Sequence, residues 1–226
     1  GAQVMTVQDF WAISPEISMA LLALVVVTVD LVTRSMAKVS AVALIGLIAP
    51  FVPARIQGRD TKFVAVEEAS TPSLTRGVYT EESADAAGLM PQVPMYTLGR
   101  EYAPPGVLAG AMRYHGVAPI VSALYREKHI SAVAHGQIES YSAGLMFTRA
   151  EGIVLSPLAM YTVKEVIEQA LRCKETGSDD TILFTVTPAV STDSTPYDSL
   201  LDGLLHDEKA EEASLKKSLG RFIGRI

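Results

Sequence analysis

Two long apolar runs mark the first quarter of the chain. Residues 17–29 form one uncharged run and residues 39–54 form another. A membrane-spanning helix needs about 20 apolar residues, and shorter runs are more often buried core helices. Both runs therefore predict helices. Only the recruitment of flanking residues, over 10–34, would give a membrane segment.

Beyond residue 60, short apolar runs alternate with longer stretches of helical periodicity. The short runs predict strands at Phe63–Val66, Ile130–His135 and Thr181–Val186, the last of them buried. The periodic stretches predict helices at residues 115–128, 140–148 and 162–174, the last with an apolar stripe that includes Val163 and Leu171. Strands that alternate with helices indicate an α/β fold with parallel strand pairing.

Two other regions lack this alternation. Residues 70–105 are rich in Pro, Gly, Ser and Thr, which predicts irregular loops with short elements. Residues 191–199 are a polar linker, and residues 200–226 predict one amphipathic C-terminal helix. We expect this helix to dock on its own domain, with partner binding or a membrane surface as alternatives. The expected organisation is an apolar N-terminal helical segment (1–38), an α/β domain (39–190) and the linker with its helix (191–226).

Composition and charge limit the classes of function that the chain is expected to have. The chain has 226 residues, of which 49% are hydrophobic and 19% charged, and its net charge is −6. An acidic chain without basic clusters does not favour nucleic-acid binding. The single cysteine, Cys173, excludes an intrachain disulfide, and the four histidines show no metal-ligand spacing. We therefore predict no metal site.

Three strings resemble a known family. They are FVAVEEASTPSLTRGVY (63–79), AGAMRYHGVAPIVSALYREKHISAVA (109–134), and a third that begins TRAEGIV (148–154) and ends VIEQALRCKETGSDDTILF (166–184). Together they resemble the C-terminal half of the beta-like subgroup of tryptophan synthase beta chains, over residues 46–187. The resemblance implies a partial pyridoxal-phosphate (PLP) domain of fold type II. The family reaction is a β-replacement that joins serine and indole to give tryptophan.

The resemblance stops short of the residues that hold the cofactor. The family's Schiff-base lysine lies in a His-Lys-x-Asn string, and none of the eight lysines here has that context. Its glycine-rich phosphate loop is replaced by KVSAVALI (38–45), whose bulky residues prevent backbone amides from approaching a phosphate closely. The catalytic residues are therefore unknown, and PLP binding by this chain is doubtful.

Other family positions are retained in part. Glu151 matches a glutamate near the cofactor ring, and Thr187 falls on a serine that meets the pyridine nitrogen, although Pro188 replaces the glycine that follows. The resemblance implies that these two residues face the cofactor and that Asp85, Arg113 and His115 lie on the substrate side. Arg113 and His115 equally fit a loop that orders the domain, and Glu151 equally fits an ordinary acid at the start of a helix.

The sequence leaves three hypotheses. In the first, the chain is a piece, descendant or chimera of the enzyme, inactive alone, that associates with itself or with a partner chain. In the second, it is a membrane-anchored structural or interaction protein, because residues 10–34 resemble the first membrane helix of the N subunit of respiratory complex I. In the third, both ends come from elsewhere. We expect a cytoplasmic location under the first hypothesis and a membrane-associated one under the second.

Overall fold

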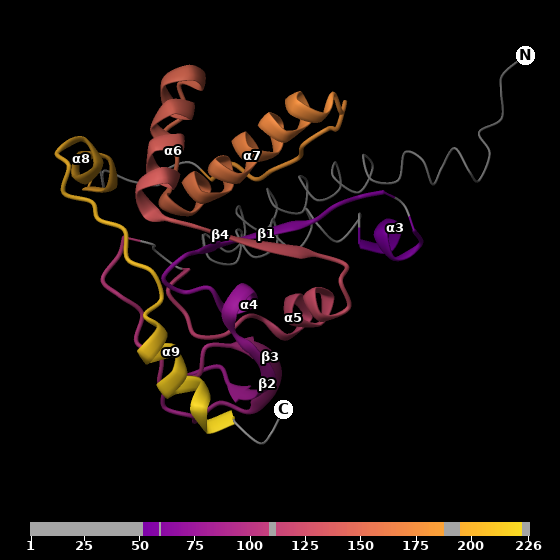
Figure 1. The fold of residues 1–226 in the computed structure, drawn as a ribbon, viewed down its shortest axis with the longest axis vertical. Helices are drawn as coiled ribbons and strands as arrows, with labels where there is room; N and C mark the ends of the chain where they lie inside the picture. Colours follow the sequence, from indigo (N-terminus) through magenta and orange to yellow (C-terminus); the bar gives the residue numbers. More distant parts are fainter. Residues whose placement is uncertain (1–51, 59, 109–111, 188–194, 223–226) are drawn as a thin grey trace, which may run out of the picture. The chain divides into compact units, whose positions relative to one another are not determined.

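The computed structural model describes residues 52–58, 60–108, 112–187 and 195–222 (Figure 1). The chain divides into two compact units, Gly1–Phe63 and Val64–Ile226. In the first unit, the described residues form helix α3 (Val52–Ile56) and the chain that follows it. The candidate membrane segment, the helices predicted over 17–29 and 39–51, and the KVSAVALI string all lie outside the described residues. Among the described residues, no helix is long and apolar enough to cross a membrane.

A parallel pair of strands carries the α/β part of the second unit. Strand β1 (Val64–Glu68) pairs with β4 (Ser131–His135), with Val64 opposite Ser131 and Glu68 opposite His135. The sequence predicted both strands to within two residues. Because parallel strands need a long crossover, the chain between them forms α4 (Ser73–Arg76), an antiparallel hairpin and α5 (Pro119–Arg126) before it returns. The helix predicted at 115–128 is confirmed, but it starts at Pro119, a residue suited to the first helical turn.

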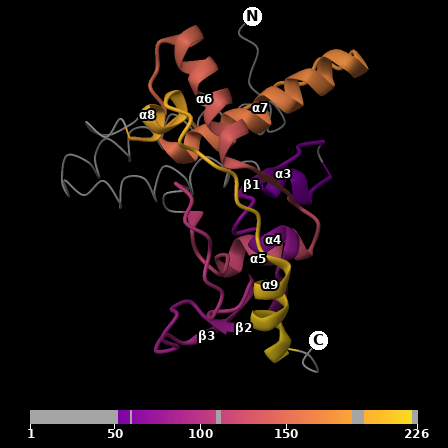
Figure 2. The same ribbon diagram turned by 60° about the vertical axis from the view of Figure 1, so that its left-hand side comes forward.

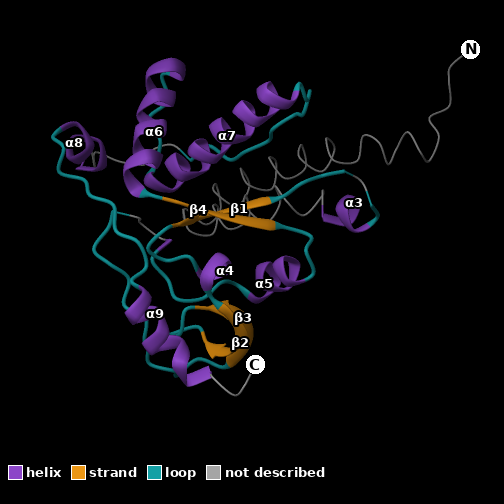
Figure 3. Cartoon of the chain, in the orientation of Figure 1, coloured by secondary structure: helices purple, strands orange, loops and turns teal. Residues whose placement is uncertain are grey.

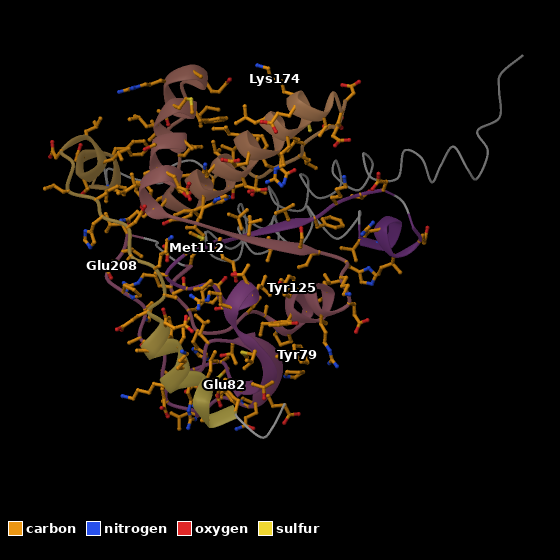
Figure 4. All side chains as sticks on the ribbon, in the orientation of Figure 1. Tyr79, Glu82, Met112, Tyr125, Lys174 and Glu208 are labelled. Atoms are coloured by element: carbon orange, nitrogen blue, oxygen red, sulfur yellow. The ribbon has the colours of Figure 1, made fainter. Side chains whose placement is uncertain are left out.

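An antiparallel hairpin occupies much of the stretch that the sequence predicted to be largely irregular. Strands β2 (Val78–Ser83) and β3 (Gln92–Thr97) pair along their whole length. Helix α5 packs on this hairpin through aromatic rings: the centroids of Tyr96 and Tyr79 lie 5.3 Å apart, and those of Tyr96 and Tyr125 lie 5.0 Å apart. The guanidinium of Arg126 covers the Tyr79 ring at 4.5 Å. Figure 4 labels Tyr79, on the hairpin, and Tyr125, on α5.

Two long helices, α6 (Gln137–Glu151) and α7 (Pro157–Thr176), contain the larger core cluster. They confirm the helices predicted at 140–148 and 162–174, but both begin earlier. Their backbones approach closely at Gly144, where an added Cβ would lie 2.4 Å from Cγ of Met160. The predicted apolar stripe of α7 is buried only in its first half, because Val163 is buried whereas Leu171 is exposed.

The buried strand predicted at Thr181–Val186 is wrong. After α7 ends at Gly177 in a left-handed conformation, residues 179–187 take no regular secondary structure (Figure 3). Phe184 packs against the core cluster, with its ring 6.3 Å from that of Phe147, but Leu183 is 60% exposed. The described residues form a two-stranded parallel sheet in which this run finds no neighbouring strand.

The C-terminal region forms two helices instead of the single one predicted. Helix α8 (Thr195–Leu201) ends at a turn in which Gly203 has a φ of 67°, and α9 (Glu212–Leu219) follows, continued by the 3-10 turn Gly220–Phe222. A second core cluster joins Leu215 of α9 to Leu98 and Tyr102. Figure 2 shows α9 beside the hairpin, so docking of this helix on its own domain is confirmed.

Candidate functional site

The carboxyl ends of β1 and β4 form one edge of the parallel pair, and ligands of open α/β sheets bind at such edges. Glu67 and Glu68 end β1, and His135 ends β4. The Glu67 carboxylate binds the start of α4: it accepts hydrogen bonds from the Leu74 amide (2.6 Å) and from the Thr75 amide and hydroxyl (both 3.1 Å). Its burial raises its pKa, and these hydrogen bonds oppose the shift.

Glu68 is the more isolated of the two acids. Its side chain is buried, and Oε2 accepts hydrogen bonds from the amide (2.8 Å) and the hydroxyl of Ser70. Oε1 is buried without a hydrogen-bond partner among the described residues, as is the hydroxyl of Tyr161 on α7. Burial raises the pKa of Glu68, and the nearby charge of Asp207 adds to the shift. Burial, with the charge of Glu68, also raises the pKa of Tyr161.

His135, at the end of β4, contacts one glutamate on each of the two long helices. Its Nε2 lies 2.8 Å from Oε2 of Glu165 on α7, and its Nδ1 lies 3.6 Å from Oε1 of Glu139 on α6. Lys164 completes the network, with its Nζ 2.5 Å from Glu168 and 3.4 Å from Glu139. These contacts hold β4, α6 and α7 together, and they leave the amine of Lys164 engaged by two carboxylates.

The three predicted substrate-side residues all make structural contacts in and around the hairpin. Asp85 lies in the hairpin turn, where its carboxylate accepts hydrogen bonds from the amides of Leu89 (2.9 Å) and Met90 (2.7 Å), and these bonds lower its pKa. His115 places Nε2 2.9 Å from the carbonyl oxygen of Ser83. Arg113 is exposed and donates to the carbonyl oxygen of Pro104 (3.1 Å). The loop alternative for Arg113 and His115 therefore has direct geometric support.

The two predicted cofactor-side residues lie on segments that flank the start of α7. Glu151 is the last residue of α6, and Thr187 lies where its carbonyl oxygen accepts a hydrogen bond from the Ser156 amide (2.9 Å), just before α7. Both side chains are exposed. No contact among the described residues joins this pair to Asp85, Arg113 or His115.

These residues do not fit a complete PLP site. A Schiff-base lysine must lose its proton to react, but the carboxylate of Glu168, with help from Glu139, raises the pKa of Lys164. The described part of the chain shows no glycine-rich turn facing Glu151 and Thr187. A cavity of about 390 Å³ lies elsewhere, between the Tyr102 loop and the start of α9, lined in part by Glu208, Lys209 and Glu211.

Comparison with known proteins finds similar sequences over part of the chain. The tryptophan synthase beta chain of Thermococcus onnurineus is 42% identical to this chain over 168 residues, which are 74% of this chain and 38% of that protein. The chain is similar, over part of its length, to tryptophan synthase beta chains. Beta chain 2 of Thermotoga maritima is 42% identical over 152 residues, 67% of this chain and 36% of that protein. Beta chain 2 of Pyrococcus abyssi is 39% identical over 172 residues, 76% and 39% respectively.

The chain therefore spans less than two fifths of the length of these tryptophan synthase beta chains. No family model matches the chain.

Sequence reasoning missed the polar residues at the strand ends. The sequence analysis assigned no role to Glu67, Glu68, His135 or Tyr161. The available signal was position, because polar residues at the ends of two parallel strands meet at one edge. The pairing of His135 with Glu165 had no such signal, since it depends on how α7 lies across the sheet.

Proposed function

We propose that this chain forms the C-terminal, cofactor-facing portion of a PLP-dependent lyase of the tryptophan synthase beta type, and that it does not catalyse by itself. The observation that carries the proposal is the 42% identity over 168 residues to a protein named tryptophan synthase beta chain. The mixed α/β fold with a parallel strand pair agrees with it.

In this proposal Glu151 and Thr187 contribute one wall of the cofactor pocket. The resemblance supports this assignment, and the hydrogen bond between the Ser156 amide and Thr187 holds the segment of Thr187 against the start of α7. Asp85, Arg113 and His115 are proposed for the substrate side on resemblance, and their observed contacts show only that they order the hairpin.

The proposal that the chain is inactive by itself rests on the lysine context and the phosphate loop that its sequence does not have. Lys164 is held as an ammonium between Glu139 and Glu168, and no lysine has the family's sequence context. Because the sequence has neither the family's lysine string nor its glycine-rich loop, we expect the chain not to hold PLP in a reactive geometry by itself.

Borohydride trapping tests the inactivity. The purified chain is incubated with PLP, reduced, and mapped by mass spectrometry, with the Thermotoga maritima beta chain as the positive control. We expect thin labelling spread over exposed lysines such as Lys174, which lies near the end of α7 (Figure 4). Stoichiometric labelling of one lysine would show that the chain holds PLP unaided.

A transplant tests the family assignment directly. Residues 64–187 replace the matching segment of the Thermococcus onnurineus beta chain, and tryptophan formation from serine and indole is measured. We expect the chimera to be active and Glu151→Gln to lower its turnover at least tenfold, whereas Glu81→Gln, at an exposed position on β2, leaves it unchanged. A folded chimera that neither binds PLP nor makes tryptophan contradicts the proposal.

A further inference from the structure

Glu82, near the end of β2, carries a buried carboxylate (Figure 4). Its side chain is 5% exposed, and its oxygens accept hydrogen bonds from the amides of Ser83 (2.9 Å) and Arg100 (3.3 Å). Two amides do not neutralise the negative charge, and a buried charge without a partner is costly. Nη2 of Arg221 contacts Oε2 of Glu82 and supplies the positive charge. Among the described residues, no other basic side chain forms an ion pair with this carboxylate.

Arg221 lies in the 3-10 turn that follows α9, more than a hundred positions from Glu82 in the chain. Its guanidinium lies 4.6 Å from the ring of Phe222, which is buried. Its Nη1 also lies 3.7 Å from Oε1 of Glu101, a residue that is mostly exposed. Arg221 is outside residues 46–187, which carry the family resemblance. The charge that neutralises Glu82 therefore comes from a segment to which that resemblance assigns no role.

The same end of β2 holds the ring of His115. Nε2 of His115 lies 2.9 Å from the carbonyl oxygen of Ser83. A carbonyl oxygen can only accept, so Nε2 carries the proton. The backbone of His115 is fixed separately, because its carbonyl oxygen accepts hydrogen bonds from the Leu98 amide (2.7 Å) and the Thr97 hydroxyl (3.0 Å). The orientation of the ring therefore depends on the position of Ser83, which directly follows Glu82.

Ser83 also closes the hairpin turn that contains Asp85. The Ser83 hydroxyl donates to the carbonyl oxygen of Met90 (3.0 Å), and the Asp85 carboxylate accepts from the amides of Leu89 and Met90. Two of the three residues proposed for the substrate side are thus held by one serine. The amide of that serine is bonded to the carboxylate of Glu82.

We propose that Arg221, by neutralising Glu82, is a positioning residue for the substrate side. Through Ser83, it orients the ring of His115 and holds the turn of Asp85. The inference rests on the proposed function, because that function is what places His115 and Asp85 beside a substrate. Without Arg221, the Glu82 carboxylate gains by turning toward water. Its hydrogen bond to the Ser83 amide is then lost, and the carbonyl oxygen that fixes the His115 ring is free to move.

Nuclear magnetic resonance of the full chain labelled with [¹⁵N]histidine tests the proposal without cofactor or activity. The ring signals of His115 are assigned by their absence in His115→Gln. In the natural chain we expect the proton to be fixed on Nε2. In Arg221→Gln we expect both ring tautomers to be populated. Hydrogen exchange of the Ser83 amide should also become at least tenfold faster in that variant.

Two further variants separate positioning from general loosening of α9. Arg76→Gln is the matched control, because Arg76 pairs with Glu212 of α9 but the two side chains are 44% and 60% exposed. Exposed ion pairs contribute little, so we expect this variant to keep the His115 tautomer and the Ser83 exchange rate. The double variant of Arg221→Gln with Glu82→Gln has no unpaired buried charge. It should restore the single tautomer and bring Ser83 exchange to within threefold of the natural chain.

Four outcomes overturn the proposal. The first two are changes at His115 in both Arg221→Gln and Arg76→Gln, or in neither. The third is failure of the double variant to restore the tautomer, which would mean that Arg221 acts through a partner other than Glu82. The fourth is equally faster exchange in residues 140–148 of α6, which would show a general loss of stability.

Failure of the proposed function gives a different pattern. The tautomer and exchange results would hold as expected, whereas a folded chimera that carries residues 64–187 would make no tryptophan. The ordering of His115 by Arg221 would then stand, and the assignment of His115 to a substrate side would fail.

Discussion

At the end of β1, the buried carboxylate of Glu68 has hydrogen-bond partners on only one of its two oxygens. Burial raises its pKa above the ordinary value of 4.5. The folded state therefore holds the proton to a higher pH than the unfolded chain does. The contribution of Glu68 to stability is fully present below pH 4.5 and is lost as the pH rises through the folded-state pKa.

We accordingly predict that Glu68→Gln removes part of the chain's loss of stability above pH 4.5. The amide cannot ionise. The free energy of unfolding of the variant should therefore rise relative to that of the natural chain between pH 4.5 and pH 8, by about 1.4 kcal/mol for each unit by which the pKa is raised. Urea unfolding of both proteins at several pH values measures the difference. A constant difference across this range would show that Glu68 does not titrate abnormally.

Glu67, next in the chain, illustrates a different solution to burial. Its carboxylate has three hydrogen-bond donors at the start of α4, two of them backbone amides. A short helix has unsatisfied amides at its first turn, and an acceptor there stabilises it. Two adjacent glutamates therefore end the same strand. Both carboxylate oxygens of Glu67 accept hydrogen bonds, whereas Oε1 of Glu68 has no partner among the described residues.

At the scale of elements, Tyr197 attaches α8 to the junction of α6 and α7. Its hydroxyl donates to the carbonyl oxygen of Leu155 (3.0 Å) and accepts from the Leu155 amide (2.8 Å). Leu155 is fully buried, so no water can replace these bonds. One hydroxyl group therefore satisfies both backbone groups of Leu155, in addition to the apolar packing of Tyr197 and Leu200 on the core cluster.

We predict that Tyr197→Phe lowers the free energy of unfolding by about 1–3 kcal/mol, because it leaves buried backbone groups unpaired. Tyr161→Phe is the matched control. It deletes a hydroxyl that is buried without a partner among the described residues, and we expect it to raise stability by about 1 kcal/mol. Equal effects of the two substitutions in urea unfolding would contradict both assignments.

At the scale of the whole molecule, the C-terminal region is held to residues more than a hundred positions earlier in the chain. Leu215 of α9 is 3% exposed and packs with Leu98 and Tyr102. Gly99 leaves room for this approach, since a Cβ there would lie 2.3 Å from the hydroxyl oxygen of Ser218. The hairpin and the C-terminal helix thus form a second core, separate from the one between α6 and α7.

We predict that Leu215→Ala lowers the free energy of unfolding by about 2–5 kcal/mol, the usual cost of such a cavity. It should also speed hydrogen exchange in residues 98–102. Leu204→Ala, at a 69% exposed position, is the control and should change stability by no more than about 0.5 kcal/mol. An unchanged stability for Leu215→Ala would show that α9 is only loosely attached.

The sequence by itself determined five of the local elements of the second unit. Hydrophobic periodicity predicted β1, β4, α5, α6 and α7, because the spacing of apolar residues depends on local backbone geometry. The same residues also carried the resemblance to tryptophan synthase beta chains, since aligned strings are a property of sequence alone.

Only the tertiary structure decided which residues share a site and which strands find partners. Residues 181–186 have a strand's pattern but no strand beside them, because pairing depends on a neighbour that the run itself does not specify. The break at Gly203 and the docking of Leu215 likewise depend on contacts distant in sequence. The contact of His135 with Glu165 follows from how α7 lies across the sheet, which residue spacing alone cannot encode.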